Sequence, residues 1–179
     1  MRKVLYVLGQ LDDLDAEWLA RAGTRRRLHD AEVVIQQGQV SPMLYILLAG
    51  ELAVDVANVG RVALLAAGEV VGEMSFVDSA PPSATVLAAG PAYVLEVPKS
   101  ALEAKIAADN GFGMRFYRAI ALFLADRLRI AQQRKVKGDK VVLDTPKVQP
   151  DELDEKVLDA VSLGGDRFDR MLRRLAGSG

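Results

Sequence analysis

The sequence predicts a mainly antiparallel β domain, a sandwich or a barrel, with helices on both sides of it. Short apolar runs separated by glycine fill residues 32–97, at the roughly 8 to 12 residue spacing that is typical of strands in these folds. A longer amphipathic helical pattern follows over residues 111–134. The 179 residues suggest one such domain with extensions, since about 100 to 200 residues per domain is usual.

The composition excludes several classes of function. The chain has no cysteine, so disulfides, thiolate catalysis and cysteine-ligated metal sites are excluded. The single histidine, His29, cannot form a histidine cluster, and we interpret it as a surface or strand-edge residue. A net charge of −1 gives no overall attraction to nucleic acid or to anionic lipid.

No part of the sequence predicts a membrane span or a signal peptide. The apolar run at residues 4–8 is too short for a signal sequence, and no run approaches the roughly 20 apolar residues that cross a bilayer. We therefore expect a cytoplasmic protein.

Residues 11–22 are predicted to form a short amphipathic helix. Leu11, Leu14, Trp18 and Leu19 recur at helical spacing, and acidic residues stand in the first turn, where the helix dipole favours them. The basic run at residues 25–27 could bind phosphate, but we favour a solvated face at the start of the first strand.

Turn-forming residues separate the predicted strands. Asn58 and Gly60 are expected to flank a hairpin, because asparagine and glycine tolerate positive φ. Residues 51–56 alternate between apolar and more polar side chains, as half-buried antiparallel strands do.

Two helices are predicted after Pro98. The first has Leu102 and Ile106 on one face and ends near Asn110 and Gly111. The second, over residues 111–134, has an apolar arc too wide for one packing partner, so we expect one face on the β domain and the other on a second copy or another domain. The arc consists of Phe116, Ile120, Phe123, Leu124 and Leu128, with Tyr117, Ala121 and Ala131 beside them. We interpret the arginines along this helix as solvated or ion-paired: Arg115, Arg118, Arg127 and Arg129.

The C-terminal part of the chain is predicted to be a linker followed by a helical tail. Residues 135–150 have mixed charge and contain glycine and proline. Residues 151–175 have the pattern of one or two amphipathic helices with a break at Gly164 and Gly165. The apolar stripe of this tail packs either on the rest of the chain or on a protein partner, and both alternatives stay open.

Residues 68–86 form the most unusual stretch of the sequence. They contain two glycine–glutamate pairs, a double proline (Pro81 and Pro82) and a Ser-Ala-Thr run. Glycine lets a backbone approach a ligand closely, a carboxylate accepts hydrogen bonds from hydroxyl groups, and small hydroxyl residues after a proline can open a short helix whose amides bind an anion. The stretch therefore predicts a ligand-binding loop.

The order of these features resembles the cyclic nucleotide-binding domain family, which includes catabolite-activator-type sensors. The resemblance covers roughly residues 11–134 and depends on Gly38, the run 44–50, the loop 68–86 and the long helix after it. It implies a jelly-roll β-barrel with an N-terminal helix and a long C-terminal helix, no catalytic residue, no metal, and no cofactor apart from a cyclic nucleotide ligand, cAMP or cGMP.

The resemblance also implies the residues of a ligand site. Glu73 would accept the ribose 2′-hydroxyl or, as the alternative, only order the loop. Ser83 and Ala84 would offer amides to the cyclic phosphate at a helix-like turn, and Thr85 a hydroxyl to the phosphate or a guanine base. The full set is Val71, Gly72, Glu73, Met74, Pro82, Ser83, Ala84, Thr85 and, over the base, Phe123 and Arg127.

One position departs from the family pattern. Pro82 stands where the family has an arginine that pairs with the phosphate. Proline has neither a charge nor a backbone N–H, and losing one member of a desolvated charge pair costs about 2 to 5 kcal/mol, or roughly 30-fold to several-thousand-fold in affinity. Arg61, Arg118 and Arg127 are the candidates to supply the charge from elsewhere.

Two functions therefore remain open. The first is a non-enzymatic regulatory or sensor module that binds a cyclic nucleotide or a related anion weakly or atypically. It would couple binding to a dimer or partner interface, and we expect a homodimer through residues 111–134. The second is a ligand-independent interaction or scaffold module with a degenerate loop, whose tail at 151–175 binds a protein partner. DNA binding is disfavoured, because the tail is too short for a helix-turn-helix domain of the catabolite-activator type and carries nearly balanced charge. An enzyme is disfavoured because the loop's carboxylates lack a base or metal partner.

Overall fold

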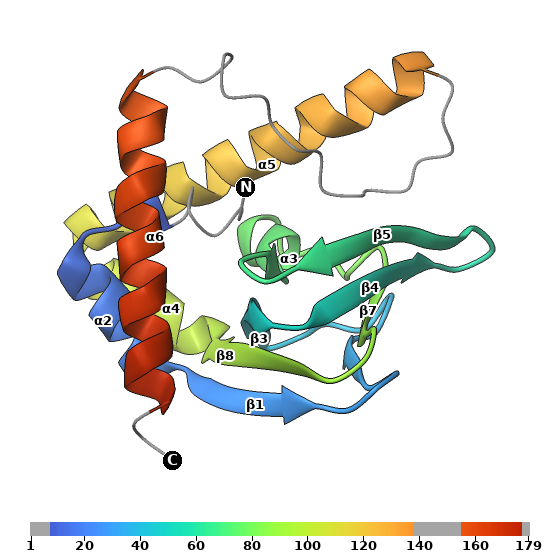
Figure 1. Ribbon diagram of the computed structural model, residues 1–179, viewed down its shortest axis with the longest axis horizontal. Coiled ribbons are helices and arrows are strands. Elements are labelled where there is room, and N and C mark those ends of the chain that lie inside the picture. Colours follow the sequence, from blue (N-terminus) through green and yellow to red (C-terminus); the bar gives the residue numbers. More distant parts are fainter. Residues whose placement is uncertain (1–7, 138–154, 177–179) are drawn as a thin grey trace.

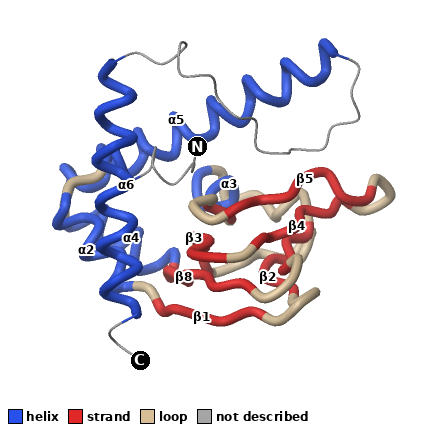
Figure 2. Tube along the Cα trace, viewed as in Figure 1, coloured by secondary structure: helices blue, strands red, loops and turns tan. Residues whose placement is uncertain are grey.

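The computed structural model describes residues 8–137 and 155–176, in which two four-stranded antiparallel sheets face each other and the helices gather at one end (Figures 1 and 2). One sheet has the order β1 (Thr24–Leu28), β8 (Ala92–Pro98), β3 (Met43–Ala49), β6 (Val70–Val71). The other has the order β2 (Val33–Ile35), β7 (Thr85–Ala88), β4 (Glu51–Val56), β5 (Gly60–Ala66). The predicted mainly antiparallel jelly-roll domain is confirmed. The sheets are not closed into a barrel, which corrects that part of the prediction, since every strand pairing lies within one sheet or the other.

Strand β3 is buried on both of its faces. Tyr45 and Leu47 point into the apolar core between the two sheets, and Leu44, Ile46 and Leu48 point the other way, into a core shared with the helices. This explains why the run has no polar alternation, because a strand covered on both faces is apolar throughout. The helices therefore cover the outer face of the β1-β8-β3-β6 sheet.

The first described long helix, α2 (Asp13–Ala22), starts two residues later than predicted. Asp12 caps it, because its carboxylate accepts from the Asp15 N–H at 2.8 Å while the Asp15 carboxylate accepts from the Asp12 N–H at 3.0 Å. Leu19 is buried as expected, but Leu14 is 76% exposed, so its predicted place in the buried face is wrong. The error arises because Leu11 precedes the helix, so its three-residue spacing to Leu14 does not define a common helix face. The buried face consists of Asp15, Ala16, Leu19 and Ala20.

Of the three arginines in the basic run at residues 25–27, one forms ion pairs and two are exposed. Arg26 pairs with both Glu32 and Glu96, whereas Arg25 and Arg27 are exposed as predicted and Arg25 lies over the Tyr93 ring at 4.4 Å.

Helix α4 (Lys99–Ala108) leads directly into the long helix α5 (Asn110–Lys137), as predicted. The Asp109 carboxylate between them accepts from the Phe112 N–H at 2.9 Å, which caps α5. Arg115 ties α5 to α2, since its guanidinium donates to the buried Asp15 carboxylate at 2.6 and 3.0 Å.

The two faces of α5 differ as expected for a helix with one intramolecular partner. Its inner face is fully buried in the helical core: Phe112, Phe116, Ala119, Ile120 and Phe123. Its outer face leaves apolar side chains in solvent: Met114, Tyr117, Leu122 and Leu128. Leu128, predicted on the buried side, is 59% exposed, because this part of α5 runs away from the helices α2 and α6 (Figure 1). The helix also continues to Lys137, into the predicted linker, whose remaining residues 138–150 lie outside the described residues.

The tail forms one continuous helix, α6 (Glu155–Ala176), so the predicted break at Gly164 and Gly165 is wrong. A glycine inside a helix costs only about 1 kcal/mol relative to alanine, and Phe168 and Met171, both buried against the helical core, offset that cost. The described part of the tail thus packs on this chain, across α2 (Figure 1), whereas residues 151–154 lie outside the described residues. No helix within the described ranges is long and apolar enough to cross a membrane.

Candidate functional site

The predicted ligand-binding loop begins with strand β6, the short helix α3 (Glu73–Val77) and a glycine between them. Gly72 has a φ of +87°, and a Cβ there would lie 2.9 Å from the Met43 carbonyl oxygen, so this position accepts only glycine without strain. Val71 pairs with Tyr45 and is buried between the sheets, so its side chain belongs to the core. Met74 on α3 is 52% exposed.

Glu73 is buried and bound by an arginine from the long helix. Its side chain is 2% exposed, and its Oε1 accepts from Arg127 Nη1 at 2.6 Å. The same guanidinium donates to the Val70 carbonyl oxygen at 3.3 Å and lies 3.5 Å from Glu69, a second carboxylate that is 2% exposed. Its flat face covers the ring of Phe123 at 4.5 Å. The structure thus brings together Glu73, Phe123 and Arg127, three of the residues predicted for one site.

The electrostatics of this cluster follow from its burial. Burial raises the pKa of Glu73 above its usual value, and Arg127 opposes the rise. Lys99, at the start of α4, is 9% exposed, and burial lowers its pKa, whereas its interactions with Glu73, Glu103 and Asp78 act in the other direction. Sequence reasoning assigned no role to Glu69 or Lys99. The only signal for Glu69 was its glycine–glutamate pair, and Lys99 gave none.

The second half of the loop has a different geometry from the one predicted. Ser83 and Ala84 form a bend that leads into β7, and the short helix, α3, lies before the prolines, so the predicted helix-like turn after them is wrong. The Pro82 carbonyl oxygen accepts from the Gly38 N–H at 2.8 Å, which holds this segment extended against the turn before β3.

Thr85 is hydrogen-bonded to the segment between β2 and β3. Its Oγ1 accepts from the Gln37 N–H at 3.1 Å and from Gln36 Nε2 at 3.2 Å. Val86, the next residue, points into the core between the sheets, and successive strand side chains point to opposite faces, so Thr85 points outward. It lines an open groove of about 660 Å³ on that outer face, together with Val33, Gln36, Gln37, Gly38, Asp55, Val56, Ala57 and Leu87.

Of the three arginines considered as replacements for the family arginine, only Arg127 reaches Glu73. Arg61 pairs with Asp55 at 3.1 Å, and Arg118 is exposed on α5. Within the described ranges, no group of three histidine or acidic side chains is placed to hold a metal ion.

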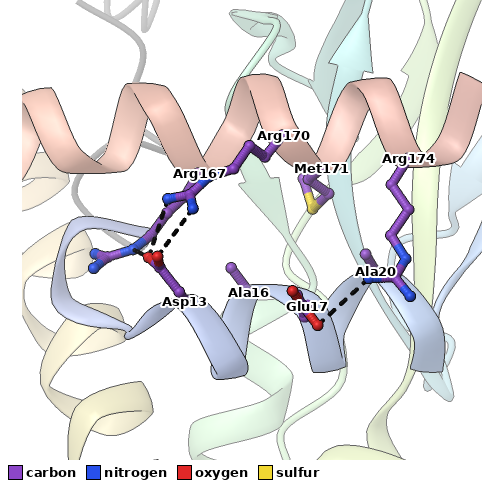
Figure 3. A pocket seen from close by; sticks show the side chains of 8 residues that line it. All are labelled: Asp13, Ala16, Glu17, Ala20, Arg167, Arg170, Met171 and Arg174. Carbon is purple, nitrogen blue, oxygen red and sulfur yellow. Dashed lines mark hydrogen bonds and ion pairs between the residues drawn. The ribbon is translucent and has the colours of Figure 1, made fainter.

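A second concave region, a groove of about 260 Å³, lies between α2 and α6 (Figure 3). The Asp13 carboxylate accepts from Arg167 Nε at 2.7 Å and from Arg170 Nη1 at 2.9 Å, and Arg174 lies 3.5 Å from Glu17. The acidic residues of α2 thus oppose the arginines of α6 across the groove. It contains none of the predicted site residues, and we interpret it as part of the helix packing.

Comparison with known proteins agrees with this architecture. Residues 25–109 match the family model described as "Cyclic nucleotide-binding domain". A cyclic nucleotide-binding domain from Methylobacillus flagellatus is 22% identical, with a TM-score of 0.68 over 76% of this chain and 83% of that chain. The N-terminal domain of a transcriptional regulator from Streptomyces coelicolor is 22% identical, with a TM-score of 0.59 over 69% of this chain and 93% of that chain. The catabolite activator protein of Thermus thermophilus is 19% identical, with a TM-score of 0.57 over 97% of this chain and 88% of that chain. No curated protein sequence matches the chain.

Proposed function

Because residues 25–109 belong to the cyclic nucleotide-binding domain family, we propose that the chain is a non-enzymatic regulatory module that binds a cyclic nucleotide weakly and transmits binding to α5. The observation that carries the proposal is the 2.6 Å ion pair between Glu73, in the ligand-binding loop, and Arg127, on α5. It is a direct link between the loop and the helix that has an exposed apolar face.

A bound ribose and Arg127 of α5 would compete for the Glu73 carboxylate. A ribose hydroxyl that donates to Glu73 takes the place of an Arg127 N–H, so the guanidinium must move or share the acceptor. A ligand shifts a conformational equilibrium only through contacts that differ between the two states, and this exchange is such a difference. Phe123 and Arg127 are one helical turn apart, so the change would act on the middle of α5.

Weak binding follows from the second half of the loop. Pro81 and Pro82 supply no N–H and no charge, and the Pro82 carbonyl already accepts from Gly38. The phosphate thus lacks the partner that would fix it most strongly. We expect dissociation constants in the millimolar range for cAMP and cGMP.

The exposed face of α5 supports a homodimer as the element that responds. Met114, Ala121 and Leu128 recur at intervals of seven residues along this face, with Tyr117 beside them. Seven-residue spacing of apolar positions is the pattern by which two helices pack along each other. Two α5 helices packed in this way would bury apolar side chains that are exposed to water in a monomer.

Calorimetry with cAMP and cGMP at millimolar concentration tests the proposal. Heat that saturates in this range is expected for the wild-type chain, and Glu73→Gln should reduce it at least tenfold in affinity, since glutamine accepts a hydroxyl without the added strength of a charge. Arg118→Met, on the exposed side of the same helix, is the matched control and should bind as the wild type does. Absence of heat with both nucleotides would contradict ligand binding.

A ligand-independent interaction module is the second candidate, and the closed state of the site favours it. Glu73 is 2% exposed and already satisfied by Arg127, and neither the outer-face groove nor the groove between α2 and α6 contains it. This candidate predicts the same dimer with and without nucleotide, which sedimentation analysis at both conditions measures.

A further inference from the structure

Two sets of arginines that are far apart in the sequence meet at one end of the helical layer. Asp13 binds Arg167, and further along both helices Glu17 lies 3.5 Å from an arginine of the last turn of α6. The two helices therefore run in the same direction, and the end of α6 lies beside the end of α2 and the start of β1 (Figure 1). The exposed arginines at this end, which we call the arginine patch, are Arg21, Arg25, Arg27, Arg173 and Arg174.

The arginine patch has a surplus of positive charge. Two acidic residues lie among its members on the same helices: Glu17, which pairs with two of the arginines, and Asp169, one turn before Arg173. Five arginines and two carboxylates leave a local surplus of three charges, although the whole chain has a net charge of −1. Within the described ranges, Arg25 and Arg27 form no ion pair. Such a surplus attracts an anionic partner.

Strand β1 adds a free backbone edge to the arginine patch. Among the described strands β8 is its only partner, and Figures 1 and 2 show β1 as the outermost strand of its sheet. Arg25 lies opposite Leu95, a residue of the helical core, so Arg25 and Arg27 point to the face of the sheet that the helices cover. Arg26 points to the other face, where two glutamates already pair with it. An open edge of this kind can accept one more strand.

From this geometry we propose that the arginine patch and the edge of β1 bind an extended acidic segment of a protein partner, which joins the sheet as an additional strand. The segment has an acidic residue at every second position, so that its carboxylates face Arg25 and Arg27 and lie next to the end of α6. The residues between them face Arg26 and are uncharged, because the charge of Arg26 is already compensated. This interaction goes beyond the proposed function and requires no nucleotide.

The same features disfavour other partners for this surface. A second copy of the chain would bring the same arginines to the edge, and like charges on opposite strands are destabilising. Nucleic acid cannot continue the backbone hydrogen bonds of a strand. The aromatic side chain at the patch, Tyr93, has Arg25 over its ring at 4.4 Å, so this face of the ring is not open to a stacked base.

Fluorescence anisotropy on the full chain tests the proposal with two labelled peptides of the same length and composition. In one peptide glutamate alternates with valine or threonine, and in the other the glutamates are consecutive. The alternating peptide should bind at least about tenfold more tightly, since only its carboxylates lie on one face of a strand. Its affinity should fall as the salt concentration rises.

Two N-methylated forms of the alternating peptide test the addition of a strand. Every second N–H of an added strand faces β1, so methylation of that set should weaken binding at least about tenfold. Methylation of the other set should leave the affinity within a few-fold of the unmodified peptide.

The double variant Arg25→Gln/Arg27→Gln should weaken binding of the alternating peptide at least about tenfold. Arg118→Gln, which removes an exposed charge from α5, is the matched control and should bind as the wild type does. The proposal is overturned by equal affinity for the alternating and consecutive peptides, by equal effects of the two methylations, or by unchanged binding to the double variant. A single-stranded oligonucleotide that binds as tightly as the alternating peptide would also overturn it and assign the patch to phosphate groups.

Discussion

Replacing Arg127 with methionine should destabilise the chain in a way that depends on pH. The substitution keeps a long apolar stem on Phe123 but leaves Glu73 and Glu69, each 2% exposed, without the guanidinium that joins them. Removing one partner of a buried ion pair costs about 3 to 5 kcal/mol, because it leaves an uncompensated buried charge. We expect a loss of this size in the free energy of unfolding near neutral pH.

The sign of the pH dependence follows from Glu73. Burial already raises its pKa above the ordinary value of 4.5, and Arg127 is the largest opposing influence, so the pKa should rise further in the variant. A carboxyl whose folded pKa is raised binds more protons in the folded state, so the variant loses stability as pH rises from about 4.5 through the raised folded value. The deficit relative to wild type should therefore be small near pH 4.5 and reach its full size above that folded value.

Denaturant unfolding of four chains, followed at about pH 5 and about pH 7.5, measures this effect. Arg118→Met changes an exposed arginine on the same helix and should shift stability by no more than about 0.5 kcal/mol. The double variant Glu73→Gln/Arg127→Met removes the unpaired charge and should recover most of the loss at the higher pH. Equal losses for Arg127→Met and Arg118→Met, or an Arg127→Met loss that is the same at both pH values, would refute the reasoning.

Three other predictions concern the fold and the assembly. Leu128→Glu should dissociate a dimer built on α5 in sedimentation analysis, whereas Val59→Glu, at another exposed site on the β4–β5 hairpin, should not. Gly72→Ala should lose about 2 to 3 kcal/mol of unfolding free energy, and Gly38→Ala about 1, because both have positive φ but only the first meets a backbone oxygen at 2.9 Å. Asp13→Ala should speed amide hydrogen exchange in α6 but not in α4, because the Asp13 carboxylate binds two arginines of α6. These arginines lower the pKa of Asp13, so in the wild type the ion pairs should weaken as pH falls below 3.8.

The fold was predictable because its turns are marked locally. Asn58 and Gly60 have φ values of 63° and 89°, so the hairpin expected between β4 and β5 is confirmed. The strand order was not predictable in the same way, because β1 pairs with β8, as Thr24 opposite Glu96 shows, across most of the domain. Pairing between strands so far apart in the sequence depends on how their side chains pack in the two cores. A short stretch of sequence contains no information about that packing.

The tail shows tertiary packing outweighing local propensity. Gly164 and Gly165 predicted a break, yet α6 passes through them. Local preference at these positions amounts to about 1 kcal/mol each, whereas burying a side chain the size of Phe168 contributes about 1.5 to 3 kcal/mol. A prediction from glycine alone fails wherever a helix has such a face to bury.

The candidate site shows why a motif predicts the shape of a loop better than its charge. The loop 68–86 was recognised from glycines, prolines and hydroxyl residues, all of which set backbone geometry, and Gly72 indeed takes the left-handed conformation. An anion site also needs a net positive potential, which is the sum over side chains brought in from other elements. Here the positive charges come from Arg127, which is 54 residues after Glu73, and from Lys99. Both interact with carboxylates in the folded chain. Residues 62–98 contain no lysine, arginine or histidine, so any positive charge at the loop has to come from other elements of the chain.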